Sequence, residues 1–198
     1  HISTPSVSVV NLTLTQMGGA VTSHSVSNAS PLEISIGSGD NTPFIAAASI
    51  TSSKINNKGY SIQADAPVYA SIRLVAGAQA GSIVSKGLAG LGTTFRVGTF
   101  TNLKTFTSNN DYLNFVTVLA TENNTQVDFS DLSAGVVIRN NTPLSVLLNA
   151  GESYVVALDP AVAPANRDGL IGALVRSTKP IVVNCGSTNG SNATGGGR

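Results

Sequence analysis

Short runs in which apolar and polar residues alternate recur along the chain, and no other feature restricts its fold as strongly. Residues 32–36 read Leu-Glu-Ile-Ser-Ile, and residues 6–15 alternate with one break that indicates a bulge. A period of two is typical of a strand with one buried face. We predict strands at both places and also at 44–50, 60–64, 67–75, 94–100, 113–120, 125–129, 135–139, 143–148, 153–158, 170–176 and 180–185.

Turn-forming residues separate these runs, whereas helix signals are nearly absent. Strands of about five residues at about ten-residue spacing are typical of a sandwich or barrel rather than a β-α-β fold. The best helix candidate is residues 82–91, where Gly87 and Gly90 limit it to a short turn. The turn signals lie at Gly18-Gly19, residues 37–40, residues 56–59, Asn123-Asn124, Ala150-Gly151 and Asp168-Gly169.

Two blocks of sequence recur at nearly the same spacing. Residues 26–40 align with residues 138–152 at an offset of 112, and residues 59–70 align with residues 172–183 at an offset of 113. A third, weaker match relates Thr4–Leu12 to Thr121–Phe129. The near-constant offset indicates an internal duplication in which each half is one folding unit.

The duplication gives the predicted architecture. In the second block a polar pair precedes Pro67 or Pro180, which predicts a β-hairpin with the proline at the entry of its second arm. We expect an all-β fold of two tandem antiparallel β-sandwich units, jelly-roll-like, at residues 1–80 and 94–198, with a connector at 81–93. The two ends read like the middle of a strand and of a loop, so we expect a fragment of a longer protein.

Composition limits the cellular compartment and the kinds of binding partner that the chain is expected to have. Charged residues make up 11% of the chain and the net charge is +1, with the basic residues scattered. We therefore expect no nucleic-acid partner, and no run approaches the roughly 20 apolar residues that direct membrane insertion needs. The single cysteine, Cys185, rules out an internal disulfide and is expected to be a small buried side chain. Polar, uncharged strand faces are typical of secreted or cell-surface β proteins.

Residues that carry chemistry are few and dispersed. A Ser-His-Asp triad would have to use His24, which lies in an alternating strand and is expected to be exposed. Asp128, Asp131 and the stretch Asn109-Asn110-Asp111 do not match a calcium loop, which leaves a solvated turn and a bound calcium ion open at each. We assign no catalytic, cofactor-binding or metal site, and expect no cofactor and no enzymatic activity.

Aromatic side chains bear on a second class of function, specific ligand binding. Tyr60, Tyr69, Tyr112 and Tyr154 are the tyrosines available for a lectin-like site. Tyr69 and Tyr154 fall in core-like strand patterns, which weakens this alternative without removing it.

Several stretches resemble the N-terminal domain of IgGFc-binding-protein-type chains, as found in large surface proteins of Bacteroidetes that include gliding-motility-associated adhesins. The likeness covers most of the chain and consists of strand and turn residues. The stretches are Asn41-Thr-Pro-Phe, Gly81-Ser-Ile-Val-Ser-Lys-Gly87, Leu91-Gly-Thr-Thr-Phe-Arg96, Ala120-Thr-Glu-Asn-Asn-Thr-Gln-Val127, Gly151-Glu-Ser-Tyr154, Gly169-Leu-Ile-Gly172 and Ser177-Thr-Lys-Pro-Ile-Val-Val-Asn-Cys-Gly-Ser187.

The resemblance implies a non-enzymatic structural or adhesive module of a large secreted surface protein. Its partners would be neighbouring domains of the same chain, surface glycans or other proteins, and an edge strand at residues 1–5 would allow self-association into filaments. The alternative is a specific glycan- or protein-binding module, lectin-like or Fc-binding-like. No set of residues in the sequence marks an immunoglobulin site.

Overall fold

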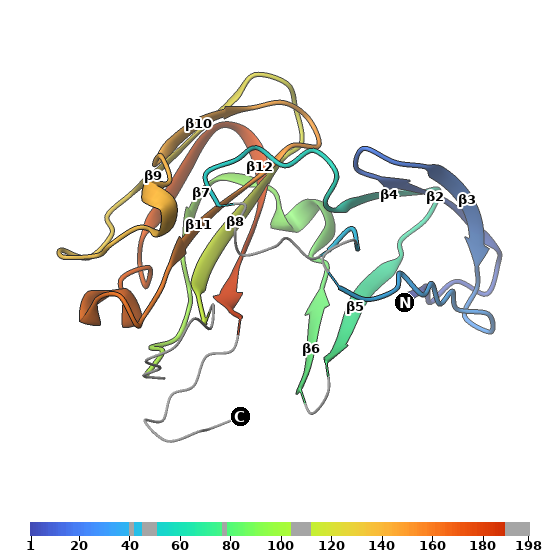
Figure 1. The fold of residues 1–198 in the computed structure, drawn as a ribbon. Coiled ribbons are helices and arrows are strands. Elements are labelled where there is room, and N and C mark those ends of the chain that lie inside the picture. The colour runs from blue at the N-terminus through green and yellow to red at the C-terminus, as the bar shows by residue number, and fades with distance from the viewer. Residues whose placement is uncertain (40–41, 45–50, 77–78, 104–111, 189–198) are drawn as a thin grey trace. The chain divides into compact units, whose positions relative to one another are not determined.

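The computed structural model describes residues 1–39, 42–44, 51–76, 79–103 and 112–188, and within these ranges the chain is all-β (Figure 1). The described helical turns are of the 3-10 type: η2 (Gly87–Gly90), η3 (Arg139–Asn141) and η4 (Pro164–Arg167). The predicted fold class of antiparallel β-sheets is confirmed. None of the helices in the described ranges has the length and apolar character to cross a membrane.

The described residues group into two compact units. The first takes in those of 1–46 and 57–90, and the second takes in those of 47–56 and 91–198. Each unit has its own hydrophobic core.

The first unit contains two three-stranded antiparallel sheets, with strand orders β1-β5-β6 and β3-β2-β4. Its core is formed by apolar residues at alternate positions, as in β2, where Val10, Leu12 and Leu14 are buried. This is the alternation that predicted the strand. The strands are β1 (Ile2–Ser3), β2 (Val10–Gln16), β3 (Val21–Val26), β4 (Tyr60–Ala64), β5 (Tyr69–Ala76) and β6 (Gln79–Val84).

The second unit contains one larger sheet with the order β10-β9-β12-β8-β11, and β7 also pairs with β12. The long central strand changes partner along its length, since its residues 174–177 pair with β9 and its residues 181–187 pair with β8. The strands are β7 (Gly92–Arg96), β8 (Asn114–Ala120), β9 (Thr125–Ser130), β10 (Ser145–Leu148), β11 (Ser153–Leu158) and β12 (Leu174–Ser187).

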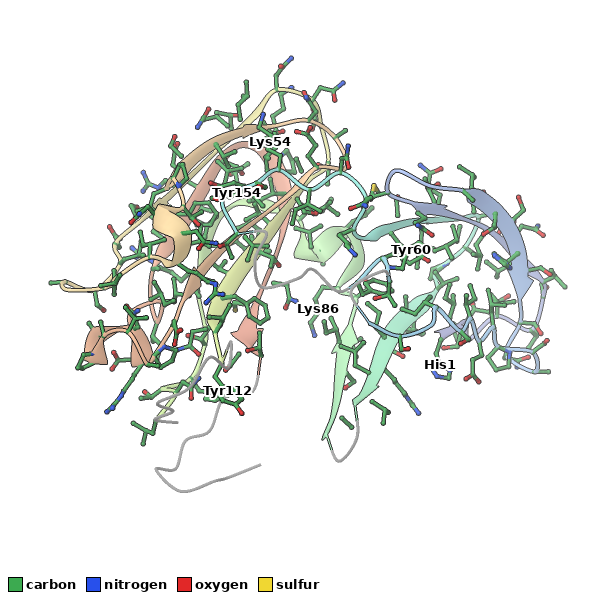
Figure 2. The ribbon with its side chains drawn as sticks, in the orientation of Figure 1. His1, Lys54, Tyr60, Lys86, Tyr112 and Tyr154 are labelled. Carbon is green, nitrogen blue, oxygen red and sulfur yellow. The ribbon has the colours of Figure 1, made fainter. Side chains whose placement is uncertain are left out.

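This sheet folds over itself so that its two ends face each other. Phe129 of β9 and Tyr154 of β11 are three strands apart in the sheet, yet their ring centroids lie 6.3 Å from one another. The Tyr154 hydroxyl donates to the Pro143 carbonyl (3.1 Å), just before β10, and the ring lies inside the unit (Figure 2). The enclosed side chains form a two-layer core, which contains Val97, Val116, Val118, Ala120, Val127, Phe129, Leu148, Tyr154, Val156, Leu158, Leu170, Ala173, Val175 and Ile181.

Two predicted strands do not form. In the 32–36 segment only Leu32 makes a bridge, to Ile2. The partner strand β1 spans only Ile2–Ser3, so the pairing ends after this one bridge. Residues 135–139 turn instead of extending, because Gly135 has a φ of +80°. The strand predicted at 44–50 lies almost wholly outside the described residues.

The predicted proline hairpins are wrong. β4 and β5 flank Pro67 but pair with different strands, in different sheets. β12 runs through Pro180 as one strand, where two were predicted. Pro180 falls between the two paired stretches of β12, so its missing N–H costs no ladder hydrogen bond. Each proline therefore marks a change of partner strand and not a turn.

The internal duplication is not confirmed. Of the first matched pair of blocks, residues 143–148 give β10, whereas residues 31–36 give a single bridge. The second matched pair does share one feature, the partner change at its proline. In the first unit this corner is held by the Thr4 hydroxyl, which donates to the Pro67 carbonyl (2.8 Å), and by the Asn11 backbone N–H, which donates to Asp65 Oδ1 (3.0 Å).

Candidate functional site

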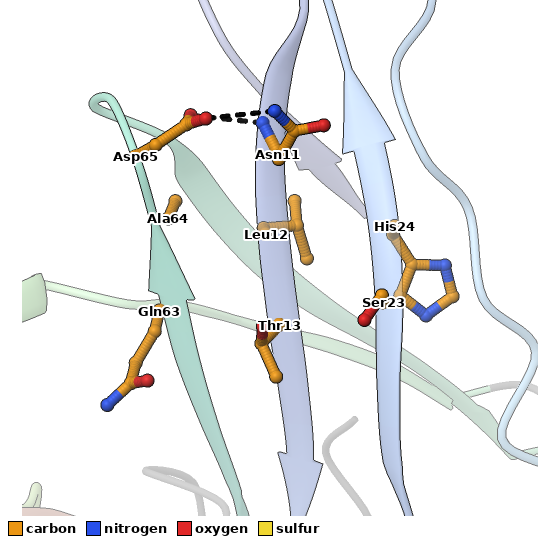
Figure 3. A pocket seen from close by; sticks show the side chains of 8 residues that line it. All are labelled: Asn11, Leu12, Thr13, Ser23, His24, Gln63, Ala64 and Asp65. Carbon is orange, nitrogen blue, oxygen red and sulfur yellow. Dashed lines mark hydrogen bonds between the residues drawn. The ribbon is translucent and has the colours of Figure 1, made fainter.

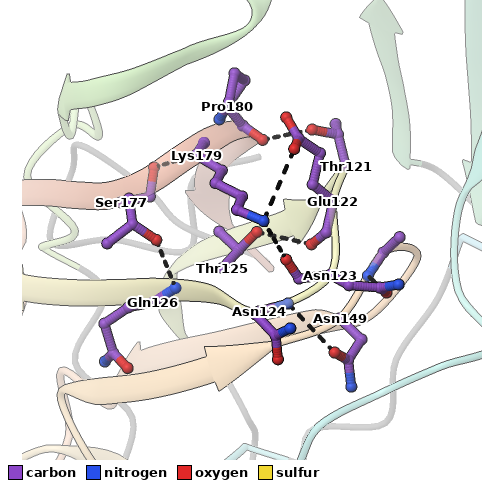
Figure 4. Close-up of polar contacts among 12 residues, drawn as sticks. Thr121, Glu122, Asn123, Asn124, Thr125, Gln126, Asn149, Ser177, Lys179 and Pro180 are labelled. Carbon is purple, nitrogen blue, oxygen red and sulfur yellow. Dashed lines mark hydrogen bonds and ion pairs between the residues drawn. The ribbon is translucent and has the colours of Figure 1, made fainter.

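Two turns and one strand segment of the second unit meet where β12 changes partner, and we call them the corner cluster (Figure 4). The cluster consists of the β8–β9 turn at residues 121–124, the β10–β11 turn at residues 149–152 and the β12 segment at residues 177–180. The Thr121 hydroxyl donates to the Pro180 carbonyl (2.5 Å), and the Gln126 backbone N–H donates to the Thr178 hydroxyl (3.0 Å). These are the same kinds of contact that hold the corner of the first unit.

Side-chain amides join the two turns of the corner cluster. The Asn123 carbonyl oxygen Oδ1 accepts from the Ala150 N–H (3.1 Å), and Asn149 Oδ1 accepts from the Asn124 N–H (3.3 Å). Asn124 has a φ of +56°, a left-handed conformation that asparagine tolerates better than most residues. The Asn-Asn sequence therefore serves as the turn that was predicted and also as the link to the second turn.

The charged groups of the corner cluster lie at its surface. Lys179 Nζ donates to the Asn123 backbone carbonyl (2.7 Å) and lies 3.9 Å from Glu122 Oε2. Glu152 Oε2 accepts from the Asn149 N–H (2.7 Å) and closes its own turn. An exposed ion pair of this kind contributes about 0–1 kcal/mol to stability. The surface thus presents an ammonium group on β12, and two carboxylates and several amides on turns that hydrogen bonds hold in place.

A second candidate is a shallow hollow of about 340 Å³ on the β3-β2-β4 sheet of the first unit (Figure 3). Thr13, Ser23 and Gln63 lie directly opposite one another on adjacent strands and so share one face. Asp65 also lines the hollow, but both of its carboxylate oxygens accept hydrogen bonds from Asn11 (3.0 Å each). Hydroxyl and amide groups are therefore what this face offers a ligand.

The residues weighed for catalysis or metal binding are dispersed. His24 lies half-buried on β3 rather than exposed, with Nε2 2.8 Å from the Thr22 hydroxyl. Asp128 accepts hydrogen bonds from Ser145 and Gln126. Asp131 pairs with Arg96 (2.6 Å). Within the described ranges no three His, Cys, Asp or Glu side chains gather as metal ligands would, and residues 109–111 lie outside those ranges.

Two expectations about single side chains need correction. Tyr69 is 66% exposed, because it lies on β5 on the face away from the core, so the core-like pattern was misleading there. Cys185 is half-buried rather than buried, on the stretch of β12 that pairs with β8. Tyr154 is in the core as expected, at 2% exposure, and burial raises the pKa of its phenol.

The fold and these sites define an all-β module that presents polar groups on exposed loops and strand faces. The family model for the IgGFc binding protein matches residues 80–197, more than half of the chain, and the chain belongs to that family. Membership of this family indicates an extracellular binding module. No curated protein and no solved structure matches the chain.

Sequence reasoning did not assemble the corner cluster, although it quoted most of its residues. Three of the family-like stretches, residues 120–127, 151–154 and 177–187, were recognised separately. The contacts that bring them together join residues as far as 59 positions apart. The proline that recurs in both halves was a signal, but with its polar pair it predicted a hairpin, and Thr4 and Thr121 appeared only in the weaker third match.

Proposed function

We propose that this chain is a non-enzymatic adhesive module of a large secreted cell-surface protein, and that it binds its partner through the corner cluster. The observation that supports this best is the convergence there of three family-like stretches from distant parts of the sequence. Binding residues are commonly found on loops that a rigid scaffold positions, because such loops vary without loss of the fold.

The chemistry of the corner cluster suits contact with another macromolecule. Glu122, Asn123 and Asn124 are exposed, and Lys179 is partly exposed, so they can form hydrogen bonds across a flat interface. Neighbouring modules of the parent chain, surface glycans and other proteins all offer matching polar groups. In a parent protein of the Bacteroidetes surface type, this adhesion would act at the cell surface and in gliding motility.

Retention of chain-coated beads under flow tests the proposal. We expect beads that carry the full chain to be retained on mucin-coated or Fc-coated glass more than on bare glass. The double variant Glu122→Ala/Lys179→Ala removes the exposed ion pair of the corner cluster, and we expect it to weaken binding about tenfold, which corresponds to about 1.4 kcal/mol.

The second unit supplies a matched control for this experiment. Arg96 and Asp131 form another exposed ion pair, outside the corner cluster. Arg96→Ala/Asp131→Ala should leave retention unchanged. Equal loss in both double variants would contradict a role for the corner cluster, and no retention of wild-type beads on either coating would contradict adhesion itself.

The hollow on the β3-β2-β4 sheet supports a second candidate function, recognition of a glycan. Its volume lies at the lower end of the roughly 300–1,000 Å³ of small-molecule sites, and its Thr13, Ser23 and Gln63 groups can donate to and accept from sugar hydroxyls. A glycan array probed with the full chain tests this. Any signal should disappear with Gln63→Ala and persist with Gln126→Ala, a glutamine of the second unit, whereas an array without signal removes this candidate.

A further inference from the structure

The edge of β12 between Val182 and Ser187 has a strand on one side only within the described part of the chain. β8 pairs with this stretch along its whole length. On the opposite side, β7 pairs with residues 174–176 and reaches Ile181 through Gly92, and no described strand continues beyond that point. Unpaired N–H and C=O groups along a strand edge form a template for another strand.

The side chains of this stretch also leave part of the core uncovered. Val183 and Cys185 pack against the core cluster of the second unit, yet both are only half-buried. Val182, on the other face, is 40% exposed. A strand added at this edge would cover apolar surface in addition to satisfying backbone groups.

The first unit shows what occupies the corresponding edge. Its corner relates β5 to the 181–187 half of β12, because each follows a proline whose carbonyl accepts from a threonine hydroxyl. β1 pairs with one side of β5, as β8 pairs with one side of β12. The other side of β5 is paired along residues 71–76 with β6. The described part of the second unit has no counterpart of β6.

β6 lies at the start of the family match, although it pairs within the first unit. The match begins at residue 80, inside β6, and continues through the second unit. β6 nevertheless pairs with β5 and groups with the first unit. The region that matches the family thus begins in a strand that pairs within the first unit.

We propose that the edge of β12 at residues 182–187, which no second strand covers within the described residues, accepts a strand of the β6 type supplied by another module of the parent chain. The proposal rests on the proposed function only in taking the chain as one module of a larger protein. β6 contains no charged residue and no proline, so it has none of the usual protections against pairing with a strand. Main-chain hydrogen bonds would supply the affinity, as in other cases of strand addition.

The register of β5 and β6 specifies which residues meet. Ile83 lies opposite Ile72, and Val84 lies opposite Ser71. The offset of 113 between the matched blocks transfers these positions to Cys185 and Asn184. The donated Ile83 would therefore lie beside Cys185 and extend the core over it.

Cys185 is the single cysteine of the chain, so it reports the register by disulfide formation. The probe is a synthetic peptide of residues 78–86 that carries the change Ile83→Cys, incubated with the full chain in a buffer of reduced and oxidised glutathione, in which the oxidised form accepts the two electrons and is released as reduced glutathione. Directly opposed residues of an antiparallel pair lie about 4.5–5.5 Å apart at Cα, within the range of a disulfide. The matched control is the same peptide with Val84→Cys instead, whose thiol points to the other face.

We expect intact-mass spectrometry to show the Ile83→Cys peptide joined to Cys185 at least about tenfold faster than the control, since only one placement brings the sulfurs together. Hydrogen exchange with the unsubstituted peptide gives a second readout, and amides within residues 182–187 should become protected when peptide is added. Equal crosslinking by the two peptides would overturn the proposal. Protection at β6 instead of β12, or edge amides that are already protected without peptide, would overturn it too.

Discussion

Removal of the Tyr154 hydroxyl tests whether the two layers of the second unit pack as described. Tyr154 is 2% exposed, and its hydroxyl donates to the Pro143 carbonyl at 3.1 Å. Tyr154→Phe keeps the ring and deletes the donor. A buried hydrogen-bond acceptor that loses its donor lowers the free energy of unfolding by about 1–3 kcal/mol. Because Pro143 itself is exposed, water can reach its carbonyl, and we expect the lower end, about 1 kcal/mol.

Urea denaturation of the full chain measures this change. The slope of unfolding free energy against urea is about 1–3 kcal/mol/M for small domains, so the midpoint for the second unit should fall by about 0.5 M. Tyr154→Ala also removes the ring that contacts Phe129 and should cost about 3–5 kcal/mol. Tyr69→Phe, at an exposed position of the first unit, is the control and should stay within about 0.5 kcal/mol of wild type.

Alkaline pH gives an independent measure of the same burial. Burial raises the pKa of Tyr154 above its ordinary value of 10.0 in the folded state. Above about pH 10 the unfolded chain therefore loses this proton first, and stability falls by at most about 1.4 kcal/mol per pH unit from this group. Below that pH the Tyr154 phenol is protonated in both states and makes its full contribution to stability. The stability difference between wild type and Tyr154→Phe should therefore shrink as pH rises past 10.

Two results would refute this account of the core. One is a Tyr154→Ala variant that loses no more stability than Tyr69→Phe, because the ring would then not lie between the layers. The other is a difference between wild type and Tyr154→Phe that stays constant up to pH 11, because the phenol would then ionise as freely in the folded chain as in the unfolded one.

Two further predictions concern backbone positions and the corner of the first unit. Gly169→Ala should destabilise the second unit by more than about 2 kcal/mol, because a Cβ there would lie 2.5 Å from the Ala165 carbonyl oxygen, whereas Gly98→Ala, with nothing within 4 Å, should be nearly neutral in thermal melts. Asp65→Ala removes the acceptor of two hydrogen bonds from Asn11 and should cost about 1–2 kcal/mol in urea denaturation, with Asp65→Asn losing less because one carbonyl oxygen remains.

Local patterns predicted the strands whose partners lie nearby or whose ends carry turn residues. β4 and β11 form at the predicted residues, because each follows a turn, at Gly59 and at Gly151, where φ is positive. The 32–36 segment has the same alternation but forms a single bridge, because its partner strand β1 is only two residues long. Alternation reports which side chains can be buried, and it does not report which backbone edges are available.

The candidate site was harder to predict than the fold, because its residues meet through long-range contacts. The turn at Asn123-Asn124 was recognised as a turn, but its links to Ala150 and Lys179 depend on how β8, β9 and β12 align. β6 was missed for a related reason. Its Gly81 and small neighbours predict a connector, and only the pairing with β5 makes the segment a strand.

The two prolines show how one sequence signal has two structural meanings. A proline after a polar pair was interpreted as the entry to a hairpin, because proline cannot donate to a central ladder. At a corner the missing proline N–H costs no ladder hydrogen bond, because the chain there has left one partner strand and has not yet reached the next. The side chains of Asp65 and Thr178 accept the neighbouring strand's N–H at this gap, and a threonine hydroxyl satisfies the proline carbonyl. A polar residue two positions before a strand proline is therefore compatible with two structures, a hairpin and a change of partner strand. In both corners of this chain a distant threonine also contacts the proline carbonyl, and only the strand pairing distinguishes the two structures.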